Sequence, residues 1–208
     1  QDPRDVLVNR WGCSLVQLPA GARIGTSSPR RAAQLKDCNP RVQVLPVRGN
    51  VETRLAKSES DEYDGVVLAA AGLVRLGLAE RASEYMSIEE FVPSPGQGVL
   101  AVEMRSNDDR MRQILASVDH PYSRSGATVE RGFLELLGGG CQLPVGAYAE
   151  VEGKALNLRV FISTTEGGSV FRSQLFGSID APHQLARDSY QAVVEQADRK
   201  LVEELNVE

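Results

Sequence analysis

The stretch "ARIGTSSPRRAAQLKD", residues 22–37, decides the fold class, because a strand passes directly into a helix there. Residues 22–28 predict the strand and its exit, and residues 29–37 predict the helix. Ser28 is the expected N-cap, and Pro29 suits the first helical turn, where no backbone N–H donor is needed. The stretch therefore predicts one strand–helix unit of an α/β layer.

The same order repeats along the first half of the chain. Residues 42–47 predict a second strand, with Pro46 at its end or on a sheet edge, and residues 51–59 predict a helix. Residues 64–71, "DGVVLAAA", predict a buried strand, and the helical pattern "LVRLGL" follows. Alternating strands and helices are typical of an α/β layer, so we expect a largely parallel sheet.

The second half shows a different pattern of predicted secondary structure. Residues 98–105 predict a strand, and residues 108–118 predict a helix with Asn107 or Asp108 as its cap. The runs "ALNLRVFIST" and "SVFRSQLFG" flank "TEGG" and predict a hairpin, and a spaced apolar pattern from Ala186 onward predicts one long amphipathic helix. The last eighty or so residues therefore predict a small α+β domain.

Composition narrows the classes of function. The chain has 208 residues, 42% of them hydrophobic and 25% charged, with a formal net charge of −5 and 5% aromatic residues. An acidic chain with few aromatic side chains is not expected to bind nucleic acid. The longest apolar run, residues 65–74, is too short to cross a bilayer. Three cysteines without a C-x-x-C pair, and only two histidines, predict no zinc site and a reducing, cytoplasmic compartment.

Arginines follow each of the three predicted strands of the first half. They are Arg30, Arg31, Arg48, Arg54 and Arg75. Ligands of open α/β sheets bind at the carboxyl ends of the strands, and guanidinium groups favour bidentate contacts with carboxylate or phosphate. Arg30 and Arg31 also oppose the helix dipole, which a bound anion would offset. Two solvated arginines remain the alternative at that position, and the absence of a P-loop motif disfavours nucleotide phosphates.

The stretch "LLGGGCQLPVGAYAE", residues 136–150, presents Cys141 among glycines. A thiol on such a bare segment could be a nucleophile or an attachment point, and nearby positive charge would raise its thiolate fraction. The alternative is a small buried residue at a domain entry, which is the interpretation we give to Cys13 and Cys38. Neither histidine forms a protease-like pattern with Cys141, so covalent anchoring is the more natural chemistry.

Five motifs, taken together and in order, resemble the porphobilinogen deaminase (hydroxymethylbilane synthase) family. They are "IGTSSPRRAAQL", "VRGNVETRL", "YDGVVLAAAGLVRLGL", "PGQG" and "GGGCQLPVGAYA", and they cover most of the chain through Glu150. The tail is similar to the family's third domain only in general pattern. The resemblance implies a transferase of tetrapyrrole (haem) biosynthesis that joins porphobilinogen units stepwise, with release of ammonia, into hydroxymethylbilane.

The resemblance also implies a cofactor and roles for the arginines. A dipyrromethane primer would be attached to Cys141 through a thioether bond. Its acetate and propionate carboxylates would be held by Arg30, Arg31 and Arg54, while Arg48 and Arg75 would face the incoming pyrrole. Neutral hydrogen bonds would come from Thr26, Ser28, Gly49 and Gln97.

The resemblance further implies a domain plan. Residues 1–93 would form a periplasmic-binding-protein-like α/β domain, the family's second domain. Residues 94–118 would return a strand and a helix to an incomplete first domain, and residues 119–208 would form the α+β third domain that carries the cofactor cysteine. The family's N-terminal segment, with a lysine and a catalytic aspartate, has no counterpart before Gln1.

From this plan we expect a family fragment that is inactive alone and a monomer when complete, with no nucleic-acid or membrane partner. We expect a cytoplasmic protein, and any organelle-targeting segment would lie in the part that precedes Gln1. The alternative function is a non-enzymatic module that binds small anions, which would explain the arginines but not the "GGGCQ" thiol.

Overall fold

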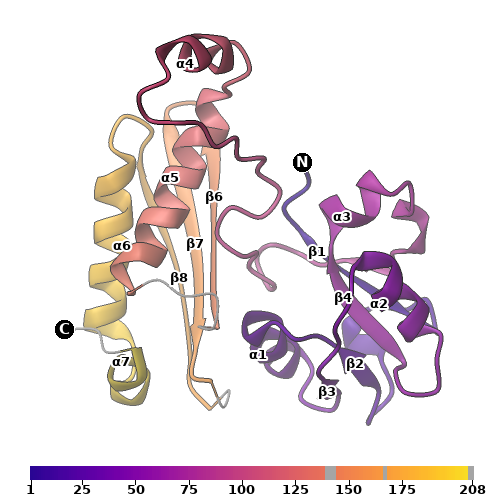
Figure 1. Cartoon of the computed structure of the whole chain (residues 1–208). Helices are drawn as coiled ribbons and strands as arrows, with labels where there is room; N and C mark the ends of the chain where they lie inside the picture. The colour runs from indigo at the N-terminus through magenta and orange to yellow at the C-terminus, as the bar shows by residue number, and fades with distance from the viewer. Residues whose placement is uncertain (139–143, 166–167, 206–208) are drawn as a thin grey trace.

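The computed structural model describes residues 1–138, 144–165 and 168–205. The described chain forms two units, each built on its own sheet (Figure 1). The first sheet has the strand order β3-β2-β4-β1-β5, and the second has the order β6-β7-β8. The chain is therefore a mixed α/β protein with a second, smaller sheet.

The three strands that the sequence predicted are parallel to one another, as expected, and two further antiparallel strands make the first sheet mixed. Its parallel part consists of β2 (Arg23–Gly25), β3 (Gln43–Leu45) and β4 (Gly65–Ala69). Two strands that the sequence did not predict, β1 (Asp5–Asn9) and β5 (Glu84–Tyr85), add antiparallel pairs on one side. All five residues of β1 are buried, because β1 lies between β4 and β5.

Three helices follow the parallel strands as predicted. They are α1 (Pro29–Cys38), α2 (Val51–Ser58) and α3 (Ala70–Arg75), and short 3-10 turns, η1 (Leu15–Gln17) and η2 (Ala79–Arg81), complete the unit. Ser28 caps α1, since its hydroxyl accepts from the Arg31 amide, and Asn50 caps α2 through the Thr53 amide at 2.8 Å. These caps place the helix starts at the carboxyl ends of the strands.

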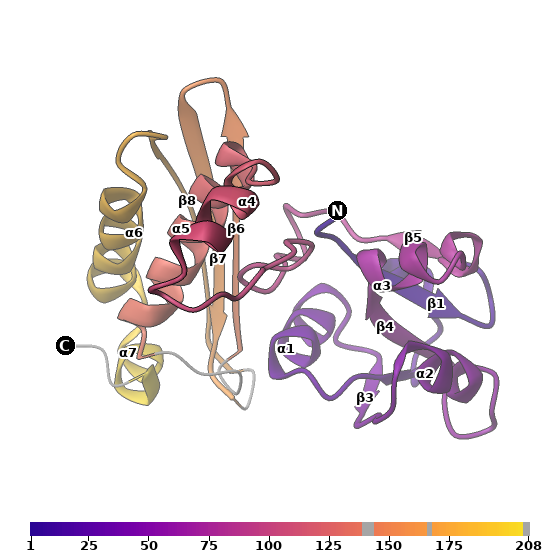
Figure 2. The ribbon, with the colours of Figure 1, turned by 45° about the horizontal axis from the view of Figure 1, so that its top comes forward.

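The second unit is an antiparallel sheet covered on one face by helices. Its strands are β6 (Val145–Glu152), β7 (Ala155–Ser163) and β8 (Val170–Ser178), and β7 with β8 is the predicted hairpin. Both views place α5 (Pro121–Leu136) and α6 (Pro182–Gln196) on the same face of this sheet (Figures 1 and 2). Val129, Phe133 and Ile162 are fully buried between them.

The predicted single helix from Ala186 onward was wrong. The chain forms α6 and then α7 (Arg199–Leu205), because Ala197 is extended (φ −70°, ψ 153°) and Asp198 starts a new turn by accepting from the Leu201 amide at 2.9 Å. The apolar spacing continues across this break, so Leu201 and Leu205 still reach the core of the unit.

The predicted strand at residues 98–105 is also absent, and this segment has no helix or strand. A strand needs a partner for its backbone groups, and neither sheet of the described residues pairs with this segment. Leu100 and Val102 are accordingly 70% and 65% exposed. The helix α4 (Asp109–Ala116) forms as predicted and is capped by Asp108, which accepts from the Met111 amide.

The two units meet where α1 lies against the face of the small sheet that its own helices leave open (Figure 2). Phe161 of β7 packs there with Ala33 and Val92. Arg172 lies over the Phe161 ring and donates to Asp37 at 2.8 Å and to the Glu90 carbonyl at 2.9 Å. In the described parts of the chain, no helix is long and apolar enough to span a membrane.

Candidate anion site at the sheet edge

The edge where the parallel strands end is also the edge where β1 begins. Asp5, the first residue of β1, lies opposite Ala69, the last residue of β4. Because β1 runs antiparallel to β4, its acidic first residue comes to the edge at which β2 passes into α1. The topology thus brings Asp5 next to the first turn of α1, which carries Arg30 and Arg31.

Asp5, Arg30 and Arg31 form a buried ionic cluster. Arg30 Nη1 donates to Asp5 Oδ2 at 2.7 Å, and Arg31 donates to Asp5 Oδ1 from Nη2 at 2.7 Å and from Nε at 3.0 Å. The Asp5 side chain is fully buried, and those of Arg30 and Arg31 are 5% and 11% exposed. Burial acts to raise the pKa of Asp5, but the two guanidinium charges outweigh it and hold this pKa below its usual value.

This geometry revises one inference from the sequence. The charge that compensates Arg30 and Arg31 in the first turn of α1 is Asp5 of the same chain, and solvated arginines, the alternative, are excluded by burial. One carboxylate faces two guanidinium groups, so the cluster keeps an excess of one positive charge. Such an excess, enclosed at a sheet edge, favours a further carboxylate or phosphate nearby.

Gln97 joins this cluster from a distant part of the chain. Its Nε2 donates to the Pro3 carbonyl at 2.6 Å and to Asp5 Oδ1 at 3.0 Å, and its Oε1 accepts from Arg30 Nη2 at 3.4 Å. The neighbouring Gly96 has φ +75° and Gly98 has φ +83°, which is why the "PGQG" stretch can turn sharply around Gln97.

The neutral residues expected at the site lie along the exits of β2 and β3. The buried Thr26 accepts from the Ser28 amide at 3.2 Å, and Ser27 Oγ both donates to and accepts from the Val47 backbone. Gly49 has φ +126°, and a Cβ there would lie 2.6 Å from Thr53 Cγ2, so only glycine fits. These contacts fix the loop that presents Arg48.

The remaining three arginines form no hydrogen bond or ion pair with Asp5. Arg54 donates from Nε to the Gly49 carbonyl at 2.8 Å. Arg48 and Arg75 are exposed, with no hydrogen bond or ion pair of their side chains to any residue that the structure describes. Arg75 closes α3, six residues beyond the end of β4, which is about 9 Å along a helix axis. The structure therefore brings Arg30, Arg31 and Gln97 together around Asp5, to which each of them donates, and leaves Arg48 and Arg75 open to solvent.

Cys141 lies outside the described residues, between α5, which ends at Leu136, and β6, which begins at Val145. Cys13 and Cys38 are half-buried and pack against the core of the first unit. Burial raises the pKa of the Cys38 thiol to about 11, so Cys38 stays a neutral thiol near pH 7.

Two residues at the site, Asp5 and Glu130, were not predicted from the sequence. Glu130 of α5 is 4% exposed, and its carboxyl accepts from the Gly96 amide at 2.6 Å and from the Ala149 amide at 2.8 Å. Burial raises its pKa to about 7, against the opposite effect of the two backbone hydrogen bonds. A signal existed in its spacing, because Glu130 lies four residues after Gly126 and three before Phe133, both buried residues of α5.

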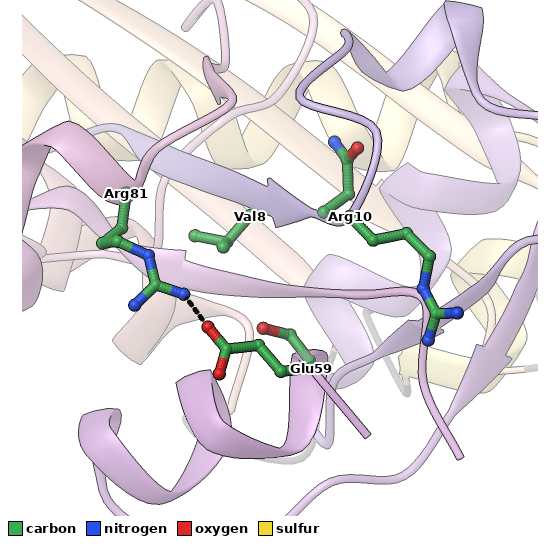
Figure 3. A pocket seen from close by; sticks show the side chains of 6 residues that line it. Val8, Arg10, Glu59 and Arg81 are labelled. Carbon is green, nitrogen blue, oxygen red and sulfur yellow. Dashed lines mark hydrogen bonds and ion pairs between the residues drawn. The ribbon is translucent and has the colours of Figure 1, made fainter. Parts of the chain in front are cut away.

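A hollow of about 380 Å³ lies at the opposite edge of the first sheet (Figure 3). It is lined by Val8, Asn9, Arg10, Ser58, Glu59 and Arg81. Its two arginines are already satisfied, since Arg81 pairs with Glu59, and Arg10 donates to the Ser60 and Tyr63 carbonyls at 2.7 Å. Among the residues with described positions, no group of three or more His, Cys, Asp or Glu side chains could hold a metal ion.

The fold and the cluster define a class: an α/β protein with an excess of buried guanidinium groups at a sheet edge, followed by a small helix-covered antiparallel sheet. Comparison with known families narrows this class. Residues 1–113 match the family model "Porphobilinogen deaminase, dipyromethane cofactor binding domain", and residues 125–193 match "Porphobilinogen deaminase, C-terminal domain". The chain belongs to the porphobilinogen deaminase family.

Curated relatives agree with this assignment. Porphobilinogen deaminase of Alkaliphilus metalliredigens is 41% identical over 208 residues, which is 100% of this chain and 66% of the relative. The Roseiflexus castenholzii protein of the same name is 48% identical over 181 residues, 87% of this chain and 59% of the relative. The Thermus thermophilus protein is 43% identical over 206 residues, 99% and 68% respectively. The chain thus spans about two thirds of the length of these relatives.

Proposed function

We propose that the chain is part of a hydroxymethylbilane synthase (porphobilinogen deaminase). This transferase would join porphobilinogen units stepwise onto a dipyrromethane attached to Cys141, releasing one ammonia for each carbon–carbon bond formed. Water would finally release hydroxymethylbilane for tetrapyrrole and haem biosynthesis. The observation that carries the proposal is the buried Asp5–Arg30–Arg31 cluster with its excess positive charge, within the region that matches the cofactor-binding family model.

The residues of the cluster fit a ligand rich in carboxylates. Each pyrrole ring of such a ligand bears an acetate and a propionate, and Arg30 and Arg31 together have more N–H donors than Asp5 can accept. The dipyrromethane, when bound, supplies the free pyrrole carbon on which the chain grows. Asp5 and Gln97 hold the two guanidinium groups in place before any ligand arrives, which lowers the entropic cost of binding.

The exposed arginines fit a different role. Arg48 and Arg75, open to solvent, would meet the carboxylates of the incoming porphobilinogen, and Arg54 would add to the grip on the cofactor. Thr26, Ser28 and Gly49 would supply neutral hydrogen bonds from the loops between them, and Gln97 would do so beside Arg30. Because the Arg48 side chain is exposed and forms no hydrogen bond or ion pair with the described residues, its removal should affect binding and not folding.

We also propose the family's domain plan for this chain. Residues 1–93 would form the periplasmic-binding-protein-like domain, residues 94–118 would belong with a further domain, and residues 119–208 would form the domain that carries Cys141. The unpaired segment with Val99, Leu100 and Val102 exposed supports the second assignment, because apolar side chains exposed close together are typical of a surface that packs against another part of a protein. The complete enzyme would be a cytoplasmic monomer, and residues 1–208 alone would be inactive.

Intact mass spectrometry tests the proposal. A chain extended by the remaining third of its relatives' length, incubated with porphobilinogen, should gain the mass of a dipyrromethane and then of further pyrrole units. Cys141→Ser should lose the whole increment, whereas the matched variant Cys38→Ser should keep it. An extended chain that turns over porphobilinogen without any mass increment would contradict covalent anchoring. One that binds small carboxylates but releases no ammonia would support a non-enzymatic anion-binding module instead.

A further inference from the structure

Glu130 has no role in the proposed reaction, yet its buried carboxyl connects two segments of the chain. Segment 93–96 lies along the open edge of β6, where the Ala147 amide donates directly to the Pro93 carbonyl at 2.9 Å. Further along, the Ala149 and Gly96 amides are both donors and cannot bond to each other. The Glu130 carboxyl lies between them and accepts one hydrogen bond on each oxygen.

On one side this bridge reaches the arginine cluster. Gly96 is followed by Gln97, whose side chain contacts Asp5 and Arg30. The path from Glu130 to the buried ionic cluster therefore consists of one backbone hydrogen bond, one peptide unit and one side chain. A shift of the Gly96 amide would move Gln97 away from Asp5.

On the other side the bridge holds both elements that flank Cys141. Glu130 itself belongs to α5, which precedes that residue, and Ala149 belongs to β6, which follows it. The two elements approach closely at this level, since a Cβ on Gly126 would lie 3.0 Å from the Ala149 carbonyl oxygen. The same carboxyl thus fastens α5, β6 and the segment with Gln97.

We propose that Glu130 is a positioning residue: by bridging the opposed Gly96 and Ala149 amides, its carboxylate sets the separation between the arginine cluster and the two elements that flank Cys141. The role of this separation in catalysis rests on the proposed function, but the bridge itself does not. A carboxylate is required because two donors need two acceptor oxygens. Glutamine at this position would offer one acceptor and one competing donor.

Protonation of Glu130 should also weaken the bridge. A protonated carboxyl has an O–H donor on one oxygen, and this donor would face an amide N–H that is itself a donor. The groups that line the adjacent hollow with Glu130 include Tyr148 and Glu150 from β6, Tyr122 from the start of α5, and Gln1. Asp2 and Arg159 act on Tyr148 from farther away. In the part of the chain with described positions, no cation forms an ion pair with Glu130, and burial raises its pKa to about 7.

Nuclear magnetic resonance of the chain tests the bridge directly. The Gly96 and Ala149 amide protons should shift downfield together as the pH rises, with one midpoint near the pKa of about 7. Glu130→Gln should abolish this titration, and Glu130→Asp, one methylene shorter, should keep the hydrogen bond to only one of the amides. Glu135→Gln removes an exposed charge from the same helix and should leave both titrations unchanged.

The spectra also show whether each variant is folded. Folded Glu130→Gln that retains the wild-type shifts of both amides, or wild-type amides that do not titrate together, would overturn the proposal. In the extended enzyme, Glu130→Gln should lower kcat on the order of tenfold to a hundredfold, with KM nearly unchanged, because the reacting groups are misplaced by about 1 Å. A normal kcat in that variant would refute the positioning role even if the bridge exists. An inactive wild-type enzyme would instead contradict the proposed function and leave the amide test valid.

Discussion

Replacing Asp5 by asparagine should unfold the first unit far more readily than its small change in volume suggests. The Asp5 side chain is fully buried and accepts from Arg30 and Arg31 over distances of 2.7–3.0 Å. Asparagine keeps one acceptor oxygen, points an amide donor at a guanidinium and leaves two buried cations without an anion. Breaking a buried ion pair by removing one partner costs about 3–5 kcal/mol, and we expect a loss in this range.

Urea unfolding followed by tryptophan fluorescence measures this loss in the relevant unit. Trp11 is the only tryptophan of the chain and lies two residues after the end of β1. The matched control is Asp2→Asn, which removes a carboxylate paired with Arg4 at 2.7 Å in a partly exposed position, and we expect a change below about 1 kcal/mol there.

The sign of the pH dependence follows from the pKa of Asp5. Because this pKa is held below its ordinary value of 3.8, the stability that Asp5 contributes is present above about pH 4 and is lost as the pH falls through the folded-state pKa. Asp5→Asn should therefore be much less stable than wild type at pH 7 and approach it under acid. A free-energy loss no larger than that of Asp2→Asn at pH 7 would refute the view that one carboxylate holds the cluster together.

Three further predictions concern other parts of the site. Arg48→Ala should abolish chain elongation in the extended enzyme while changing the free energy of unfolding by less than about 0.5 kcal/mol, because the side chain is exposed; normal hydroxymethylbilane production would contradict its role. The pKa of Glu130 is raised from 4.5 to about 7, so the free energy of unfolding of wild type should fall by about 3 kcal/mol relative to that of Glu130→Gln as the pH rises from about 4.5 to 7. Urea unfolding followed by circular dichroism measures this, and a free-energy difference between the two proteins that does not change with pH would exclude the raised pKa. Gly49→Ala should cost about 1–3 kcal/mol in the same assay, since φ is +126° and Thr53 blocks a Cβ, and an effect near zero would contradict that geometry.

Local signals in the sequence predicted the strand–helix units well. The caps Ser28 and Asn50 act within three residues of themselves, so their effect can be read from a short stretch of sequence. The strand β1 was missed because its partner β4 lies about sixty residues away, and nothing within "DVLVN" announces that pairing. The pattern at residues 98–105 failed in the opposite way: it favours a strand, but pairing decides whether one forms.

The candidate site divides along the same line. The positions of Arg30 and Arg31 at a sheet edge follow from the local order of strand, cap and helix, and the structure confirms that they lie there. Their counter-charge could not be predicted, because Asp5 reaches them only through the antiparallel direction of β1. Glu130 is invisible for a related reason, since both of its partners are backbone amides and carry no sequence signature.

The charge balance of the cluster explains how the site can be both stable and receptive. Two guanidinium groups alone in a buried position would repel each other and be costly to desolvate. Asp5 removes most of that cost and fixes both groups, yet its single charge leaves one positive charge uncompensated. A second internal carboxylate would have made the cluster more stable and left it without net charge. With one, a carboxylate ligand meets donors that are already oriented, and its binding free energy is not spent on ordering two long side chains.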